Sequence, residues 1–129
     1  MTQISAKLNN YRQSPRKVRL VADALRGKKA VDAIVTLSFM PKRASKPLQK
    51  LLSSAVQNGK NIGLPTENLV VKELTVDNGP ILYRRQPRSR GMANPIRKRT
   101  SHVKVILSEG KMVKDDSKSK KDKNIKKVK

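Results

Sequence analysis

The segment VDNGPILYRRQPRSRGMANPIRKRTSHVKVIL, residues 76–107, decides how this chain folds. Turn-forming residues stand before its first apolar run and again at its middle, at Asn78, Gly79, Pro80, Pro87, Gly91 and Pro95. Alternating apolar residues at Val103, Val105 and Leu107 then indicate a strand with one buried face. The pattern predicts two long strands folded back on each other as an extended β-hairpin.

The same segment is strongly basic. No acidic residue occurs between residues 78 and 108, and the stretch 84–99 carries Arg84, Arg85, Arg88, Arg90, Arg97, Lys98 and Arg99. As a strand, residues 80–87 would span about 25 Å, comparable with the diameter of a compact domain of this size, whose radius is about 13 Å. The hairpin arm, about residues 79–103, is therefore expected to project beyond the body and to require a polyanionic partner.

Length and composition allow one compact domain with an appendage. The chain has 129 residues, enough for a single core, which we expect within residues 1–110. After Gly110 the sequence becomes KMVKDDSKSKKDKNIKKVK, with nine lysines, three aspartates and almost no apolar residue. Residues 111–129 are therefore expected to form a disordered, Lys-rich tail.

The charge balance favours a nucleic-acid partner. Lys and Arg number 31 against 9 Asp and Glu, a net charge of +22 that an anionic partner must neutralise. No stretch approaches the roughly 20 apolar residues of a membrane-spanning helix, and no secretory or myristoylation signal is present. The lack of cysteine excludes disulfides, and a cytoplasmic location is the default expectation. With only three aromatic residues, binding is expected to rest on phosphate and shape rather than on base stacking.

The N-terminal part predicts a strand followed by a helix. Residues 3–8 alternate weakly, with Ile4, Ala6 and Leu8 on one side, which predicts a short strand that joins a sheet formed later in the chain. Ser14 and Pro15 are typical of a helix start, and Gly27 is expected to end that helix. Its apolar stripe consists of Val18, Val21, Ala22 and Leu25.

Two more helices and a strand are expected before the arm. Residues 30–37 predict a helix with Val31, Ile34 and Val35 directed inward. Another helix is expected from Pro41 towards Asn58, where the interior Pro47 predicts either a kink at residues 43–45 or a late helix start. Residues 69–76 then read as a strand with Val70, Leu74 and Val76 on one face and Lys72 interrupting the alternation.

Basic side chains beside these apolar stripes are candidate phosphate contacts. Arg12, Arg16, Lys17, Arg19 and Arg26 accompany the first helix, and Lys42, Arg43, Lys46 and Lys50 accompany the third. An ordinary solvated face is the alternative for both groups. The arm carries mostly arginine, whose rigid fork holds phosphate through two hydrogen bonds, so a defined nucleic-acid contact is favoured there.

Catalysis and metal binding are not expected. His102 is the only histidine, and no carboxylate lies near it in sequence, the closest being Glu109. A zinc site needs three or four ligands, and acid–base chemistry needs a positioned partner. His102 is therefore interpreted as a surface or RNA-facing residue, and no cofactor is expected because no nucleotide-binding or metal motif is present.

Two strings resemble a known family: RQSPRKVRLVADALRG at residues 12–27, and the opening segment at residues 76–107 with its IRKRTSH motif. They are similar to the bacterial form of the universal twenty-second protein of the large ribosomal subunit, over about residues 6–107. The resemblance implies an α+β body of three helices packed on a small antiparallel sheet, with a long protruding hairpin. It also implies a structural role supporting subunit assembly, cytoplasmic and without enzymatic activity.

The resemblance further implies partners for each part. The body would bind 23S rRNA near the mouth of the peptide exit tunnel, and the hairpin would run between rRNA segments to a constriction shared with the fourth large-subunit protein. Gly91, Met92 and Ala93 would line the tunnel beside the nascent peptide, with macrolide sensitivity linked to the hairpin. The resemblance implies rRNA contacts at Arg84, Arg88, Arg90, Arg97, Lys98 and Arg99. Arg85, Thr100 and His102 join them as candidates.

Two positions depart from the family pattern, since Met92 stands where a basic residue usually follows the tip glycine and Tyr83 where a lysine commonly precedes Arg84. Arg85, often apolar in relatives, adds positive charge nearby. An alternative function is a histone-like DNA architectural protein with a minor-groove β-arm. Such proteins are usually dimers with an apolar interface, and no surplus apolar helix face is evident here, so a homo-oligomer is not expected.

Overall fold

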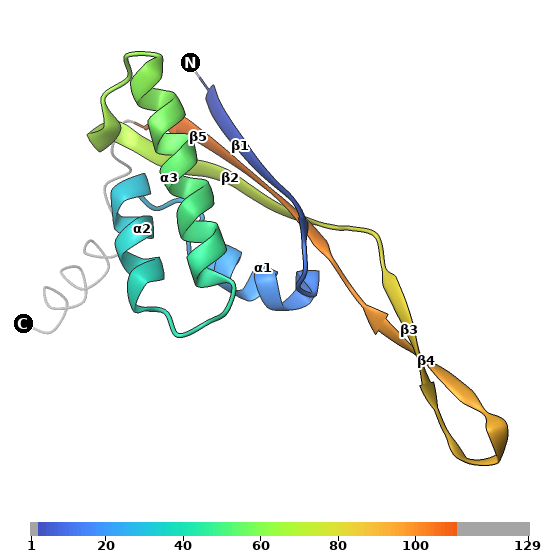
Figure 1. Ribbon diagram of the computed structural model, residues 1–129. Coiled ribbons are helices and arrows are strands. Elements are labelled where there is room, and N and C mark those ends of the chain that lie inside the picture. Colours follow the sequence, from blue (N-terminus) through green and yellow to red (C-terminus); the bar gives the residue numbers. More distant parts are fainter. Residues whose placement is uncertain (1–2, 111–129) are drawn as a thin grey trace, which may run out of the picture.

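The strand β5 (Ser101–Glu109) lies at the centre of a three-stranded antiparallel sheet in the computed structural model, which describes residues 3–110 (Figure 1). It pairs on one edge with β1 (Gln3–Tyr11) and on the other with β2 (Leu69–Asn78). The strand predicted at residues 3–8 therefore does join a sheet formed by later segments. The predicted tail, residues 111–129, lies outside the described residues.

Three helices cover one face of this sheet (Figure 1). They are α1 (Pro15–Asp23), α2 (Ala30–Phe39) and α3 (Ser45–Asn61), and a short 3-10 helix, η1 (Thr66–Asn68), leads into β2. The inward residues of the strands include Val103, Val105 and Leu107, as predicted, and they pack with the helices into one apolar core. The α+β architecture expected from the sequence is confirmed.

The helix α1 begins as predicted and ends early. Ser14 is the N-cap in an extended conformation and Pro15 occupies the first turn, where its missing N–H is not needed. The helix ends at Asp23, although Leu25 beyond it is still buried. Gly27, with a φ of +75°, turns the chain so that its N–H donates to the Val71 carbonyl at 3.0 Å. The segment after α1 thereby pairs with the free edge of β2.

The inward face of α2 differs from the prediction. Ala30, Ala33 and Leu37 are buried, whereas Val31 and Val35 are 48% and 51% exposed. Because seven of the ten residues of this helix are apolar, its sequence contains two overlapping apolar stripes, and periodicity cannot choose between them. The stripe with the small alanine side chains is the one that faces the core.

The interruption at Lys72 is a register shift in β2. The pairing with β5 shifts between Val71 and Glu73, so that one extra residue is inserted in β2. Val71 is consequently buried on the same face as Leu74 and Val76, and Val70 is only half-buried. The predicted position of Val70 on the inward face was wrong. The extra residue at Lys72 reverses the alternation of buried and exposed residues before it, so that Val71 faces inward and Val70 does not.

Pro47 lies in the first turn of α3, because the helix begins at Ser45 rather than near Pro41. A first-turn N–H has no acceptor within the helix, so a proline there removes no hydrogen bond. Of the two alternatives predicted for Pro47, the late helix start is therefore confirmed.

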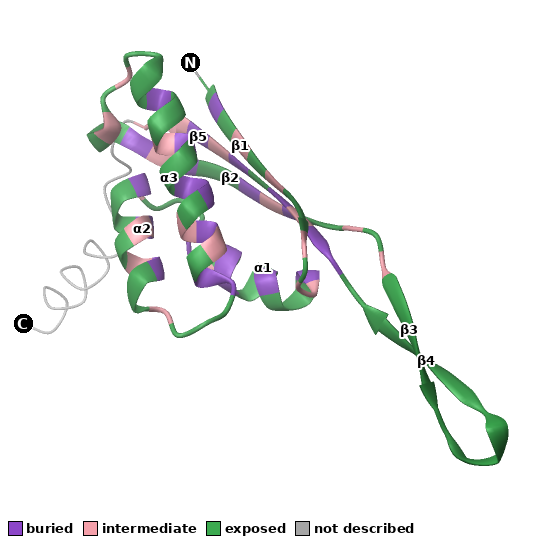
Figure 2. Cartoon of the chain, in the orientation of Figure 1, coloured by how far each residue is buried: buried purple, intermediate pink, exposed green. Residues whose placement is uncertain are grey.

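The arm is a separate two-stranded sheet that extends away from the body (Figure 1). Its strands are β3 (Leu82–Pro87) and β4 (Ala93–Lys98), joined by a short 3-10 turn, η2 (Ser89–Gly91). Every residue in the range 82–99 is exposed (Figure 2). The arm therefore projects as predicted, and contributes nothing to the core.

Side-chain hydrogen bonds hold the root of the arm. The Thr100 hydroxyl, on a residue only 4% exposed, donates to the Pro80 carbonyl at 2.6 Å, and the Gly79 N–H donates to the Thr100 carbonyl at 3.0 Å. A Cβ added at Gly79 would collide with the Thr100 Oγ1. The Asn10 N–H donates to His102 Nδ1 at 3.1 Å and so ties the end of β1 to β5. These bonds connect the arm and the body where the two sheets part.

Two arginines of the α1 region bind the outer edge of β2. Arg19 donates through Nε and Nη2 to the Val76 carbonyl at 3.1 and 2.9 Å, and Arg26 does the same to the Leu74 carbonyl at 3.1 and 2.9 Å. Arg26 also contacts Asp23 at 2.6 Å. Unpaired carbonyls on an edge strand are sites for unwanted strand pairing. The two guanidinium groups cover that edge and fix α1 against the sheet.

We expect Arg19→Gln and Arg26→Gln each to destabilise the body by about 1 kcal/mol, because each removes charged hydrogen bonds to a backbone carbonyl. Urea unfolding followed by circular dichroism measures the effect. Arg16→Gln is the matched control, since it removes the same charge from an exposed side chain of α1 that has no hydrogen bond within residues 3–110. An equal loss in the control would mean that charge, not the carbonyl contact, is responsible.

We also expect the body to fold without the end of the arm. Replacing residues 88–96 by a short Gly-Ser turn should leave the cooperative thermal transition within a few degrees of its original midpoint, because that stretch buries no side chain. Near-ultraviolet circular dichroism and amide exchange of β5 report the state of the core. Loss of the cooperative transition would show that the arm contributes to the stability of the body.

Candidate nucleic-acid interface

The arm presents positive charge on both of its faces. In the register of β3 and β4, Leu82 lies opposite Lys98 and Tyr83 opposite Arg97. Because side chains alternate along a strand, Arg84 and Lys98 share one face, and Arg85 and Arg97 share the other. No arm residue takes part in an ion pair among the described residues. A partner that neutralises these charges must approach the arm from two sides.

Apolar side chains on the arm are also uncovered. Leu82, Tyr83, Met92 and Ile96 are between 38% and 66% exposed. A two-stranded ribbon on its own is marginally stable in water. The arm therefore exposes both apolar and cationic side chains, and neither kind is covered within residues 3–110.

The root of the arm brings cations together from distant segments. A hollow of about 500 Å³ is lined by Asn10, Arg12, Pro80, Leu82, Arg84 and Thr100. Arg12 and Arg84, predicted separately as phosphate contacts, therefore lie around one depression. A smaller hollow of about 70 Å³ on the same junction includes Arg99 and Pro15.

Four predicted contact residues have roles inside the protein. Arg19 and Arg26 bind the Val76 and Leu74 carbonyls, the Thr100 hydroxyl is buried against Pro80, and His102 accepts the Asn10 N–H. These groups position the arm and α1. An RNA contact by any of these four residues stays a prediction, whereas Arg16 and Lys17 on α1 are exposed without such bonds.

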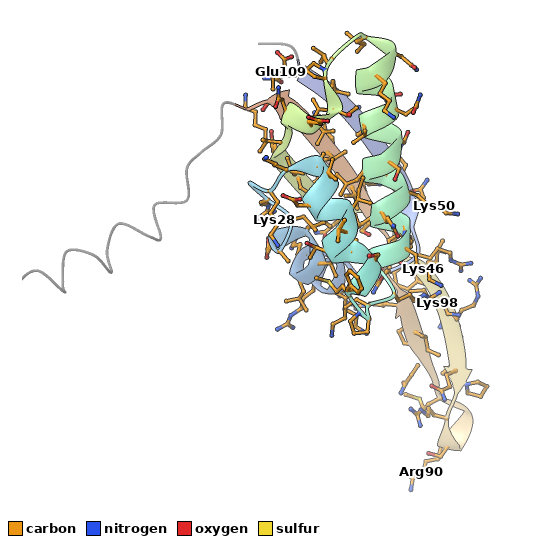
Figure 3. All side chains as sticks on the ribbon, turned by 90° about the vertical axis from the view of Figure 1, so that its left-hand side faces the viewer. Lys28, Lys46, Lys50, Arg90, Lys98 and Glu109 are labelled. Atoms are coloured by element: carbon orange, nitrogen blue, oxygen red, sulfur yellow. The ribbon has the colours of Figure 1, made fainter. Side chains whose placement is uncertain are left out.

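A second basic region surrounds the start of α3. Lys42 and Arg43 lie in the loop before the helix, and Lys46 lies in its first turn. Lys46 and Lys50 extend to the same side of the molecule as Lys98 of the arm (Figure 3). This region is therefore oriented to share a partner with the arm.

Tyr11 connects the α3 region to the root of the arm. Its hydroxyl donates to Gln13 Oε1 at 2.7 Å and lies 3.3 Å from the Arg43 carbonyl. Burial raises the pKa of the Tyr11 phenol above its usual value, and the charge of Arg43 opposes this shift. The phenol therefore stays protonated at neutral pH and keeps its donor.

One pair of lysines was missed by sequence reasoning. Lys7 on β1 lies directly opposite Lys104 on β5, and both side chains are exposed. Like charges directly opposite each other destabilise a sheet unless an anion separates them. Both lysines occupy outward positions of predicted strands, but only the register of the two strands shows that they lie opposite each other.

Two other kinds of feature are absent from the described residues. Within residues 3–110, no group of three or more His, Asp and Glu side chains is placed to hold a metal ion. None of the helices in this range has the length and apolarity needed to cross a membrane. The concentration of exposed cations is the distinctive feature of the surface.

A comparison with protein families agrees with this geometry. The family model described as ribosomal protein L22p/L17e matches residues 6–108, a range that includes all three helices and the entire arm. The match also covers both strings that carried the resemblance. The chain therefore belongs to the ribosomal protein L22p/L17e family, and it has a structural role in the large ribosomal subunit.

Proposed function

We propose that this protein binds 23S rRNA through its basic body surface and inserts its arm between rRNA segments. The observation that carries this proposal is the arm itself, in which residues 82–99 are all exposed and the seven charged side chains are all positive. Such a ribbon has neither a core nor an internal counter-charge. Converging RNA strands would cover its side chains and neutralise its positive charges.

Charge on two faces fits a partner that surrounds the arm. Guanidinium groups hold phosphate oxygens through paired hydrogen bonds, so Arg84 and Arg85 can bind phosphates on opposite sides of β3. Neutralising phosphates on both sides would lower the repulsion between the RNA segments that approach each other there. This is also the physical basis for a contribution to subunit assembly.

The tip of the arm is suited to a different environment. Arg88 donates its N–H to the Met92 carbonyl at 2.7 Å, and the Met92 N–H donates to the Ser89 carbonyl at 3.3 Å, which closes the turn. The second half of this turn and the residue after it, Gly91, Met92 and Ala93, form an uncharged stretch, and Met92 is 66% exposed. We propose that this stretch lines the nascent peptide exit tunnel, at a constriction shared with the fourth large-subunit protein, because a surface that faces a channel does not need to hold phosphate.

Replacing Arg97, Lys98 and Arg99 by alanine is expected to weaken 23S rRNA binding and to lower its salt dependence. Each lost phosphate contact removes a counterion-release contribution, so the slope of log K against log salt should fall by about 2. Filter binding between 50 and 300 mM KCl measures this slope.

The control for this experiment is a triple alanine variant of Lys28, Lys60 and Lys72, which are exposed on the body outside the proposed contacts. It removes the same charge, and its salt slope should change much less. Equal slopes for the two variants would mean that the arm attracts RNA only through overall charge.

A photoreactive side chain at position 92 is expected to crosslink to the nascent peptide in translating ribosomes, because the tip would face the tunnel. Mass spectrometry or gel analysis of labelled nascent chains identifies the product, and position 85 on the strand serves as the control that should give rRNA crosslinks. Crosslinks to rRNA alone from position 92 would reject the tunnel placement and leave RNA binding intact. Crosslinks to DNA in cells would favour the architectural alternative.

A further inference from the structure

The only phenylalanine of the chain lies on the surface. Phe39, the last residue of α2, is 83% exposed, although the core is built entirely from aliphatic side chains. Single exposed apolar residues are common on proteins. Phe39, however, continues into Met40 and Pro41, so that an aromatic ring lies beside further apolar surface.

This surface forms one wall of a hollow between α2 and α3. The hollow has a volume of about 700 Å³, and its lining includes Leu37, Phe39, Met40, Lys42, Ser45 and Lys46. That volume lies within the range of small-ligand sites. No acidic residue contributes to the lining, whereas Lys42, Arg43 and Lys46 all do. The hollow therefore combines an apolar side with a cationic side.

The cationic side also contains an unpaired hydroxyl. Ser45 is 3% exposed and lines the hollow, and its Oγ has no hydrogen-bond partner in the described part of the protein. Buried hydroxyls are normally hydrogen-bonded, and a ligand atom in the hollow could supply a partner for this one. Ser45 is the first residue of α3, where the positive end of the helix dipole favours an anion.

The backbone at this position adds one donor. The Ser45 N–H donates to the Lys42 carbonyl at 3.0 Å, and Pro47 has no N–H. The Lys46 N–H is left as the first free donor of the helix, because its acceptor would lie four residues back and no such bond forms. An anion here would meet this N–H, the Ser45 hydroxyl and the side chains of Lys42 and Lys46.

We infer that this hollow binds a single unpaired nucleotide of the RNA, with its base stacked on Phe39 and its phosphate at the start of α3. A nucleotide is the ligand that carries a flat apolar ring system and an anion a short distance apart, matching the two sides of the hollow. The base must be unpaired and unstacked for its face to reach a side chain. This inference rests on the proposed rRNA binding and adds a specific recognition site to it.

The basic surface continues beyond the first hollow. Lys46 also lines a second hollow of about 400 Å³, together with Lys7 and Lys50. The phosphate that follows the bound nucleotide would therefore meet further lysines as the RNA passes over α3 and β1. An acidic peptide with an apolar side chain is the alternative occupant of the first hollow, and crosslinking from position 39 distinguishes a peptide from a nucleotide.

A photoreactive phenylalanine derivative at position 39, in assembled large subunits, is expected to crosslink to one unpaired nucleotide of 23S rRNA. Primer extension locates the modified nucleotide. The matched control is the same derivative at Leu20 of α1, another apolar residue on a helix surface, 68% exposed, which should give no crosslink at that nucleotide. Crosslinks from position 39 to a protein, or to no molecule, would overturn the nucleotide site.

Affinity for purified 23S rRNA provides the second test. Phe39→Leu keeps the apolar bulk and removes the ring, and it should weaken binding about tenfold without changing the salt slope, since no phosphate contact is lost. Phe39→Tyr keeps the ring and should bind as the unmodified protein does. Leu20→Ala is the control for loss of exposed apolar surface and should have no effect.

Ser45→Ala gives a readout that is independent of stacking. Removing an unpaired buried hydroxyl should raise the thermal midpoint of the free protein, yet weaken RNA binding about threefold. A rise in the midpoint with unchanged affinity would mean that the hydroxyl does not contact RNA, and would overturn the phosphate position.

The outcomes separate this inference from the broader proposal. Unchanged binding by Phe39→Leu, together with weakened binding by the triple variant of Arg97, Lys98 and Arg99, would reject the nucleotide site and retain rRNA binding by the arm. Unchanged binding by both variants would reject both.

Discussion

The rest of the structure depends on the hydrogen bonds that β5 makes along both of its edges. The strands β1 and β2 each pair with β5 and not with each other, so the sheet exists only through this central strand. Only two residues, Arg99 and Thr100, separate β5 from β4 of the arm. The direction of the arm is therefore set by the same strand that organises the core, and the Thr100 and Gly79 bonds at the root transmit that direction to β3.

A chain with a net charge of +22 must fold despite its own repulsion. The body does this by keeping cations out of the core and by giving two of them backbone partners, since Arg19 and Arg26 bind free carbonyls of the edge strand β2. The opposed pair Lys7 and Lys104 shows the opposite arrangement, in which repulsion is left unrelieved within the described residues. Charge on this protein is thus partly structural, and the remainder is available to an anionic partner.

Much of the fold was predictable from local patterns. The capping signal at Ser14 and Pro15, the alternation of β5 and the turn glycine Gly91 of the arm act over a few positions, and the structure agrees with them. Pro95, predicted as a turn residue, instead lies within β4. The inward face of α2 depends on how elements meet in space, because apolar residues occur on more than one side of this helix. Lys72 showed that the alternation of β2 is interrupted, but only the pairing with β5 shows that an extra residue is inserted there. In the candidate interface, two features could be found only from the structure. Arg12 and Arg84 are distant in sequence and meet at the root of the arm. The burial of the Ser45 hydroxyl without a partner results from how the start of α3 packs.

The pairing of Gln3 with Ser108 has a consequence for the order of events during synthesis. The first strand of the sheet cannot find its partner until almost all of the described chain has been made, and such distant pairings form slowly because the intervening loop must be ordered first. The helices and the whole arm are synthesised before β5 is complete. The cationic arm is thus exposed to its surroundings while the sheet that will fix its direction is still unpaired, so capture of the arm by a polyanion can precede completion of the body.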